Sequence, residues 1–132
     1  MIEMEIYFDG NKKVNANLNG NIIKTDQPIQ GGGDGTAPSP FDLFLASIGT
    51  CAGIYVKGFC DQRGLSTDGI KIIQHMNFNP STRLIDKIDL EIQVPKDFPD
   101  KYKEAVINSA NLCAVKKHLQ NPPQFTVYTK AV

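Results

Sequence analysis

The sequence has no surplus of charge of either sign, because 14 lysine and arginine residues balance 14 aspartate and glutamate residues among 132. Proteins that bind nucleic acids usually carry a basic surface, since neutralising phosphates releases the counterions that dominate affinity. The balance therefore argues against a nucleic-acid partner. With 41% hydrophobic and 21% charged residues, the composition is that of an ordinary globular protein, and we expect a single domain spanning residues 1–132.

Cysteine and histidine are scarce. The three cysteines, Cys51, Cys60 and Cys113, are an odd and small number for a secreted domain held by disulfides. Neither they nor the two histidines show the short paired spacing of a zinc site, so we expect no metal and no cofactor. The start of the chain lacks the basic segment and apolar run of a signal peptide. These absences predict a cytoplasmic protein in which any cysteine chemistry is catalytic.

Alternating apolar residues predict three strands near the N-terminus, within residues 2–8, 13–19 and 22–25. Asp9-Gly10 and Asn19-Gly20 are hairpin turn signals, so the strands form an antiparallel meander. Residues 27–38 are rich in glycine and proline and form a loop. Their glycine spacing does not match a phosphate-binding motif, which leaves a lid or linker as the interpretation.

A long helix follows, with Ser39 as N-cap, Pro40 at the first helical position and Gly64 after the end. Residues 43–56 form an uncharged segment, but this segment is shorter than the roughly 18 to 20 residues that cross a bilayer. We therefore expect a buried core helix and no membrane partner. Because this helix is apolar on every side, one sheet and one further helix cannot cover it. The pattern predicts that a second subunit does so.

The second half predicts two strands at residues 70–78 and 84–94, a second helix over 98–119, and a closing strand that contains Phe125, Val127 and Tyr128. The order β-β-β-α-β-β-α-β defines an α+β domain.

Helix geometry separates the cysteines. Cys51 and Cys60 are nine residues apart on the first helix and lie on opposite faces, so they cannot bridge each other, and only Cys113 can pair with either. Small residues surround Cys51 and allow a second element or a ligand to approach closely: Gly49, Thr50, Ala52 and Gly53. A free cysteine in such a position is also compatible with a simple buried apolar role.

Two segments resemble the OsmC/Ohr family: residues 37–51 (APSPFDLFLASIGTC) are similar to its first-cysteine helix, and residues 113–119 (CAVKKHL) to its second-cysteine segment. The resemblance implies an OsmC-like fold, an intertwined homodimer with two central helices, and a thiol peroxidase that reduces organic hydroperoxides in oxidative or osmotic stress defence. It implies that Cys51 is the peroxidatic cysteine and Cys113 the resolving one, with an external dithiol as reductant. It also implies a carboxylate near the start of the first helix that holds an arginine of the N-terminal strands, and Asp42 is the residue of this chain indicated for that role.

Several positions differ from the family pattern. The only arginines, Arg63 and Arg83, lie outside the N-terminal strands, Phe41 stands where a glutamate is common, and Ala114 where a proline is common. Lysines at positions 12, 13 and 24 are the remaining cations there, but they lack the fork of a guanidinium. We therefore expect a Cys51 thiol that titrates nearer to an ordinary thiol. The alternative function is an OsmC-like stress protein that binds a small apolar or electrophilic ligand at the dimer interface without efficient peroxidase turnover.

Overall fold

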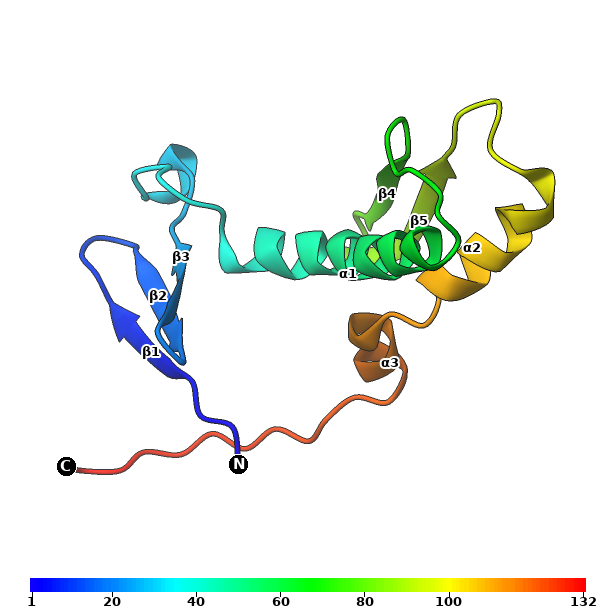
Figure 1. Ribbon diagram of the computed structural model, residues 1–132. Helices are drawn as coiled ribbons and strands as arrows, with labels where there is room; N and C mark the ends of the chain where they lie inside the picture. The colour runs from blue at the N-terminus through cyan, green and yellow to red at the C-terminus, as the bar shows by residue number, and fades with distance from the viewer. The chain divides into compact units, whose positions relative to one another are not determined.

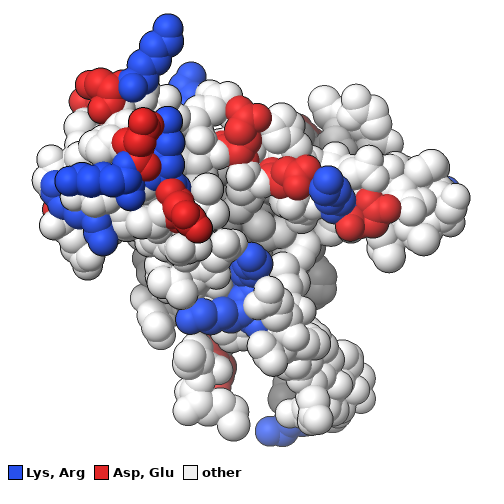
Figure 2. All heavy atoms as spheres, turned by 90° about the vertical axis from the view of Figure 1, so that its right-hand side faces the viewer, with Lys and Arg blue, Asp and Glu red and all other residues white.

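The computed structural model describes all 132 residues and shows two compact units, residues 1–46 and residues 47–132. Helix α1 (Pro40–Gln62) begins in the first unit and continues through the second (Figure 1). Both units combine strands with helical segments, so the α+β class predicted from the sequence is confirmed. Charges of both signs are interspersed on the face shown in Figure 2, in keeping with the balanced composition.

The first unit contains the predicted three-stranded meander. Strands β1 (Glu5–Phe8), β2 (Val14–Leu18) and β3 (Asn21–Thr25) pair antiparallel in that order. Asn19 and Gly20 both have positive φ angles of 52° and 86°, as a tight hairpin turn between right-twisted strands requires. Residues 1–4 do not pair, so the first strand is shorter than the alternation predicted.

The loop after β3 is organised around a buried carboxylate, that of Asp26, whose side chain is fully buried. It accepts hydrogen bonds from the backbone N–H groups of Gln27 (2.7 Å) and Thr36 (3.1 Å) and from the Thr36 hydroxyl (2.7 Å). A short 3₁₀ turn, η1 (Ile29–Gly31), lies within the loop. A Cβ on Gly33 would lie 2.0 Å from the Gln27 carbonyl oxygen, so the backbone passes too closely for any side chain. The loop is a hydrogen-bonded unit instead of the open linker expected from its composition.

Helix α1 begins and ends where the sequence predicts. The backbone N–H of Asp42 donates to the Ser39 hydroxyl at 3.2 Å, which is the expected N-cap, and Gly64 follows the helix with a φ of 64°. Its buried residues lie on one face: Ile48, Ala52, Val56, Phe59 and Cys60. Other faces are open, and Ile54 is 64% exposed. The prediction of a wholly buried helix is therefore not met within one chain, because the elements of one chain cover only one side.

By length and composition alone, α1 could cross a membrane, with 23 residues and a mean hydropathy of 1.5. A single helix of this kind is weak evidence, since core helices of soluble proteins have the same properties. In the second unit one face of α1 packs in the core.

In the second unit, strands β4 (Lys71–Asn79) and β5 (Leu84–Gln93) form an antiparallel pair in which Ile72 lies opposite Ile92. Both strands are close to the predicted ranges. The buried face of α1 packs with helix α2 (Lys103–Ala110) and with apolar side chains of the two strands. Members of this core include Ala52, Val56, Phe59, Phe98, Val106 and Ala110, with Ile72, Leu90 and Ile92 against them.

The predicted second helix over 98–119 is wrong in its continuity. The chain forms a 3₁₀ turn, η2 (Asp100–Tyr102), then α2, then a separate helix α3 (Ala114–Gln120). The break falls at Cys113, which has an extended backbone (φ −49°, ψ 129°) and caps α3 with its own sulfur.

The predicted closing strand is also absent from the single chain. Residues 121–132 form no helix or strand, and Phe125 and Val127 are 85% and 96% exposed. Apolar alternation gives a segment the capacity to form a strand, but a strand forms only when a neighbour pairs with its backbone groups. No strand of this chain pairs with the segment.

Candidate active site

The structure brings together the two cysteines that the resemblance singled out. Cys51 lies on α1 and Cys113 lies between α2 and α3, and the Cys113 thiol makes a side-chain hydrogen bond with the Cys51 sulfur. The backbone N–H groups of Val115 and Ala114, in the first turn of α3, also donate to Cys51. Three donors therefore converge on one sulfur atom. All three cysteines are free thiols.

These donors lower the pKa of Cys51 below its ordinary value. The largest cause is the hydrogen bond from the Val115 N–H, followed by that from the Cys113 thiol. Burial opposes them, and the Ala114 N–H adds a lowering effect smaller than that of burial. Hydrogen bonds to the charged form of a thiol stabilise the thiolate, which is the nucleophilic form. The expectation of a nearly ordinary thiol is thus corrected in direction: hydrogen-bond donors of α3 and Cys113 lower the pKa of Cys51.

Cys113 has the opposite character. Its side chain is 2% exposed, and burial raises the pKa of its thiol, with the neighbouring Cys51 acting in the same direction. Its sulfur accepts a hydrogen bond from the Lys116 N–H at 3.4 Å. The pair therefore consists of one sulfur that ionises easily and one that stays protonated, which is the division of roles expected between a nucleophile and a proton-bearing partner.

Cys60 takes no part in this arrangement. It is fully buried in the core, and burial raises the pKa of its thiol, with Asp61 adding to the effect. Its surroundings are those of a small apolar core residue.

The small residues around Cys51 serve close packing of α1 against β4. A Cβ on Gly49 would lie 2.6 Å from the Gln74 amide oxygen, and one on Gly53 would lie 3.8 Å from the Ile72 Cδ1 atom. Of the two possibilities left open by the sequence, a second element therefore occupies these positions.

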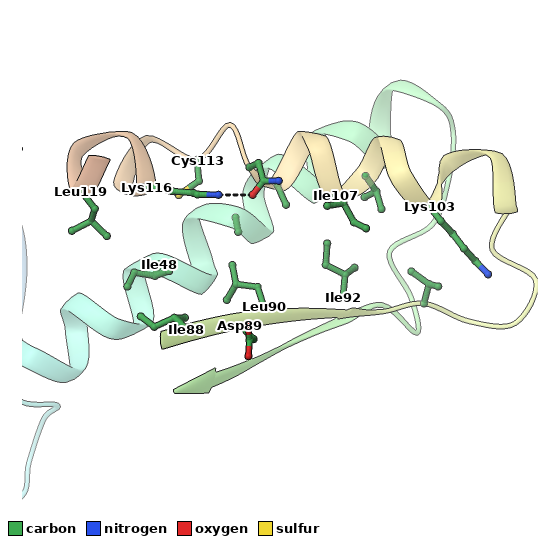
Figure 3. A pocket seen from close by; sticks show the side chains of 15 residues that line it. Ile48, Ile88, Asp89, Leu90, Ile92, Lys103, Ile107, Cys113, Lys116 and Leu119 are labelled. Carbon is green, nitrogen blue, oxygen red and sulfur yellow. Dashed lines mark hydrogen bonds between the residues drawn. The ribbon is translucent and has the colours of Figure 1, made fainter. Parts of the chain in front are cut away.

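Cys113 also borders a cavity of about 570 Å³ within the second unit. The side chains of β5 line one wall and those of α2 and α3 the other, with Ile48 and Ala52 of α1 completing it (Figure 3). The cavity therefore reaches one member of the cysteine pair, Cys113.

The third residue indicated by the resemblance, Asp42, is exposed in the first turn of α1. Of the N-terminal lysines, Lys13 forms an ion pair with Asp34. No group of three or more His, Cys, Asp or Glu side chains is placed to hold a metal ion.

Sequence reasoning missed Lys116. Its backbone N–H donates to Cys113, and its side chain lines the cavity and donates to the Asn111 amide oxygen at 2.7 Å. The only signal in the sequence was its position three residues after a cysteine, which becomes informative once Cys113 is known to be a helix cap.

Fold and site together define an α+β protein with a dithiol pair between a long helix and a short one. The chain belongs to the OsmC-like protein family, whose model matches residues 32–128. Comparison with curated proteins gave no match.

Solved structures of related proteins share the fold. An osmotic stress induced and detoxification response protein of Psychrobacter arcticus has a TM-score of 0.69 and 24% identity, covering 89% of this chain and 87% of that one. An OsmC-like protein of Mycoplasma pneumoniae has a TM-score of 0.65 and 12% identity, with 92% and 89% covered. The organic hydroperoxide resistance protein OhrB of Bacillus subtilis has a TM-score of 0.51 and 16% identity, with 92% of each chain covered. At these identities the likeness establishes the fold.

Proposed function

We propose that this protein is a cysteine-based thiol peroxidase that reduces organic hydroperoxides in oxidative or osmotic stress defence. The observation that carries the proposal is the Cys51 sulfur, which accepts hydrogen bonds from Val115, Ala114 and Cys113. A sulfur held in this way is a thiolate at lower pH than an ordinary cysteine, and a second thiol is already in contact with it. The name of the OhrB relative, an organic hydroperoxide resistance protein, supports the same chemistry.

The reaction follows from these two roles. The Cys51 thiolate attacks one oxygen of the peroxide, the O–O bond breaks, and the leaving alkoxide takes up a proton to become an alcohol. Cys51 is then a sulfenic acid. The Cys113 sulfur attacks the Cys51 sulfur, water leaves, and a disulfide forms. An external dithiol reduces this disulfide through a mixed disulfide and is itself oxidised.

A homodimer is part of the proposal. The open apolar side of α1, including Ile54 at 64% exposed, is more apolar surface than a stable soluble monomer normally shows. The unpaired segment with Phe125 and Val127 needs a strand partner as well. A second copy would meet both needs and unite residues 1–132 into one OsmC-like domain. We place the dimer in the cytoplasm, where thiol reductants keep cysteines reduced.

A second candidate is an OsmC-like stress protein that binds a small apolar or electrophilic ligand without efficient turnover. The observation in its favour is that neither arginine, Arg63 or Arg83, lies in the N-terminal strands. A guanidinium group to position the peroxide is therefore missing from those strands.

Consumption of cumene hydroperoxide with a dithiol reductant separates the two candidates. We expect turnover by the wild type, loss of at least a hundredfold in Cys51→Ser, and a single stoichiometric turnover in Cys113→Ser, which lacks the resolving thiol. Cys60→Ser is the matched control and should retain turnover. Mass mapping of the oxidised wild type should find a Cys51–Cys113 disulfide. Unchanged consumption in Cys51→Ser, or a disulfide that includes Cys60, would contradict the proposal, and stoichiometric labelling of Cys51 without turnover would favour the second candidate.

A further inference from the structure

The cavity beside Cys113 has two apolar walls. Ile88, Leu90 and Ile92 line it from β5, and Ile107 and Leu119 line it from α2 and α3 (Figure 3). A cavity of about 570 Å³ lies within the range that encloses most of a small organic ligand. Its walls favour an unbranched apolar chain, because they offer side-chain methyl groups along a strand.

One cation on these walls has no acidic partner. Lys116 is half-buried, and the hydrogen bond given to its ammonium group is from Nζ to the neutral Asn111 amide, the dashed line in Figure 3. The cavity's other charged side chains are exposed and paired: Lys103 with Asp100 at 2.8 Å, and Asp89 with Lys87 at 3.6 Å. The cavity therefore presents an unneutralised positive charge to any occupant.

The position of Lys116 is not explained by the stability of α3. It lies in the first turn of the helix, where the helix dipole opposes a positive charge, whereas Lys117 and His118 lie in the last turn, where the dipole favours one. A carboxylate beside Nζ would add the charge partner that the neutral Asn111 amide does not supply.

We propose that this cavity is a binding site for an acidic amphiphile, an unbranched monocarboxylate whose carboxylate pairs with Lys116 and whose alkyl chain lies between Ile107 and the apolar face of β5. Charge complementarity selects the headgroup, and the two apolar walls select the tail. The inference goes beyond the proposed peroxidase reaction, because binding requires neither thiol to react, although Cys113 borders the cavity.

Calorimetric titration of the full-length Cys51→Ser variant with sodium hexanoate, octanoate and decanoate tests the site without any turnover. We expect each added methylene to tighten binding about fourfold. Decanol and decylammonium should bind at least tenfold more weakly than decanoate. Equal binding of decanoate and decylammonium would overturn the role of the charge.

Variants locate the site. Lys116→Gln should weaken decanoate binding at least tenfold and leave decanol binding unchanged, whereas the neighbouring Lys117→Gln, which does not line the cavity, should have no effect. Ile107→Glu should weaken both ligands, and because Ile107 is 51% exposed this change should be tolerated by the fold, as circular dichroism would show. An effect of Lys103→Gln in place of Lys116→Gln would overturn the assignment. Absence of decanoate binding in a protein that sediments as a dimer would also overturn it, and would indicate that a second copy fills the cavity.

Discussion

Thr36 donates twice to one carboxylate oxygen of Asp26: its backbone N–H lies 3.1 Å and its hydroxyl 2.7 Å from Oδ2. The other oxygen, Oδ1, accepts the backbone N–H of Gln27 at 2.7 Å. Since every donor addresses the ionised form, these bonds hold the pKa of Asp26 well below its ordinary value, with the Thr36 hydroxyl as the largest cause. One buried carboxylate thus holds together the start of the loop, at Gln27, and its end, at Thr36.

Asp26→Asn should therefore destabilise the protein, because the amide places donor hydrogens against groups that are themselves donors. We expect the Tm at pH 7 to fall by several degrees. The wild type gains stability from the depressed pKa of Asp26 at all pH values above the ordinary 3.8, and loses it as pH falls below that value. The difference between wild type and variant should accordingly shrink at low pH, as thermal unfolding at several pH values would measure.

The exposed Asp97→Asn is the control and should follow the wild type at every pH. A Tm difference for Asp26→Asn that is unchanged between pH 7 and pH 3 would show that the carboxylate charge does not stabilise the loop.

The elements that sequence predicts well are those set by neighbouring residues. The hairpin at Asn19-Gly20 and the start of α1 at Ser39 depend on local backbone preferences that can be seen in a few letters. The role of Asp26 could not be predicted, because its partner Thr36 is brought back only by the folded loop. The break before α3 was missed because cysteine is not a usual helix cap, whereas Ser, Thr, Asp and Asn are.

The candidate site also has features that the sequence predicts and features that it does not. Cys51 and Cys113 were indicated by resemblance to a family, and helix geometry separated Cys51 from Cys60. Apart from the Cys113 thiol, the donors that lower the pKa of Cys51 are backbone N–H groups. Every residue but proline carries such a group, so residue type does not identify these donors in the sequence. Only the position of α3 against α1 identifies Val115 as a donor.

Cys113→Ala should raise the pKa of Cys51, because it removes the thiol that donates to the Cys51 sulfur. The rate of Cys51 alkylation by iodoacetamide rises with pH as the thiolate forms, and its midpoint should lie below the ordinary 9.0 in the wild type. In the variant we expect the midpoint to move to higher pH. Mass spectrometry of each cysteine peptide between pH 6 and pH 10 measures this.

Cys60→Ala is the control and should leave the Cys51 midpoint in place. If Cys60 or Cys113 were alkylated before Cys51 in the wild type, the proposed order of reactivity would be wrong.

Ala114→Pro separates the stability of α3 from the reactivity of Cys51. Ala114 is the first residue of α3, where proline is favoured, and the extended backbone of Cys113 suits a following proline. We expect no gain in the free energy of unfolding, because the preference for proline at this position is offset by the loss of a hydrogen-bonded N–H. The same change removes an N–H that donates to Cys51, so the pKa of Cys51 should rise.

Urea unfolding and the alkylation profile together test this opposition. Ala114→Ser, which keeps the N–H, is the control and should leave the alkylation midpoint of Cys51 unchanged. A proline variant that is more stable and has an unchanged alkylation midpoint would show that the Ala114 N–H does not donate to Cys51.

Gly58 tests whether a second copy covers the open side of α1. A Cβ at this position meets nothing within 4 Å in the chain, and Ile54, one helical turn before it, is 64% exposed. In one chain alone, Gly58→Ala would stabilise the helix by about 0.5–1 kcal/mol, since alanine loses less backbone entropy than glycine. Gly58→Trp would leave the fold intact for the same reason, because open space surrounds the position.

A dimer packed through this face changes the outcome for the large side chain. We expect the wild type to sediment as a dimer at micromolar concentration and Gly58→Trp to sediment as a folded monomer, with unchanged helical circular dichroism. Asp97→Trp adds the same side chain at an exposed position outside α1 in the sequence and should remain dimeric. A Gly58→Trp protein that dimerises as tightly as the wild type would mean that this side of α1 is free, and the second copy would have to be sought at the unpaired segment that contains Phe125 and Val127.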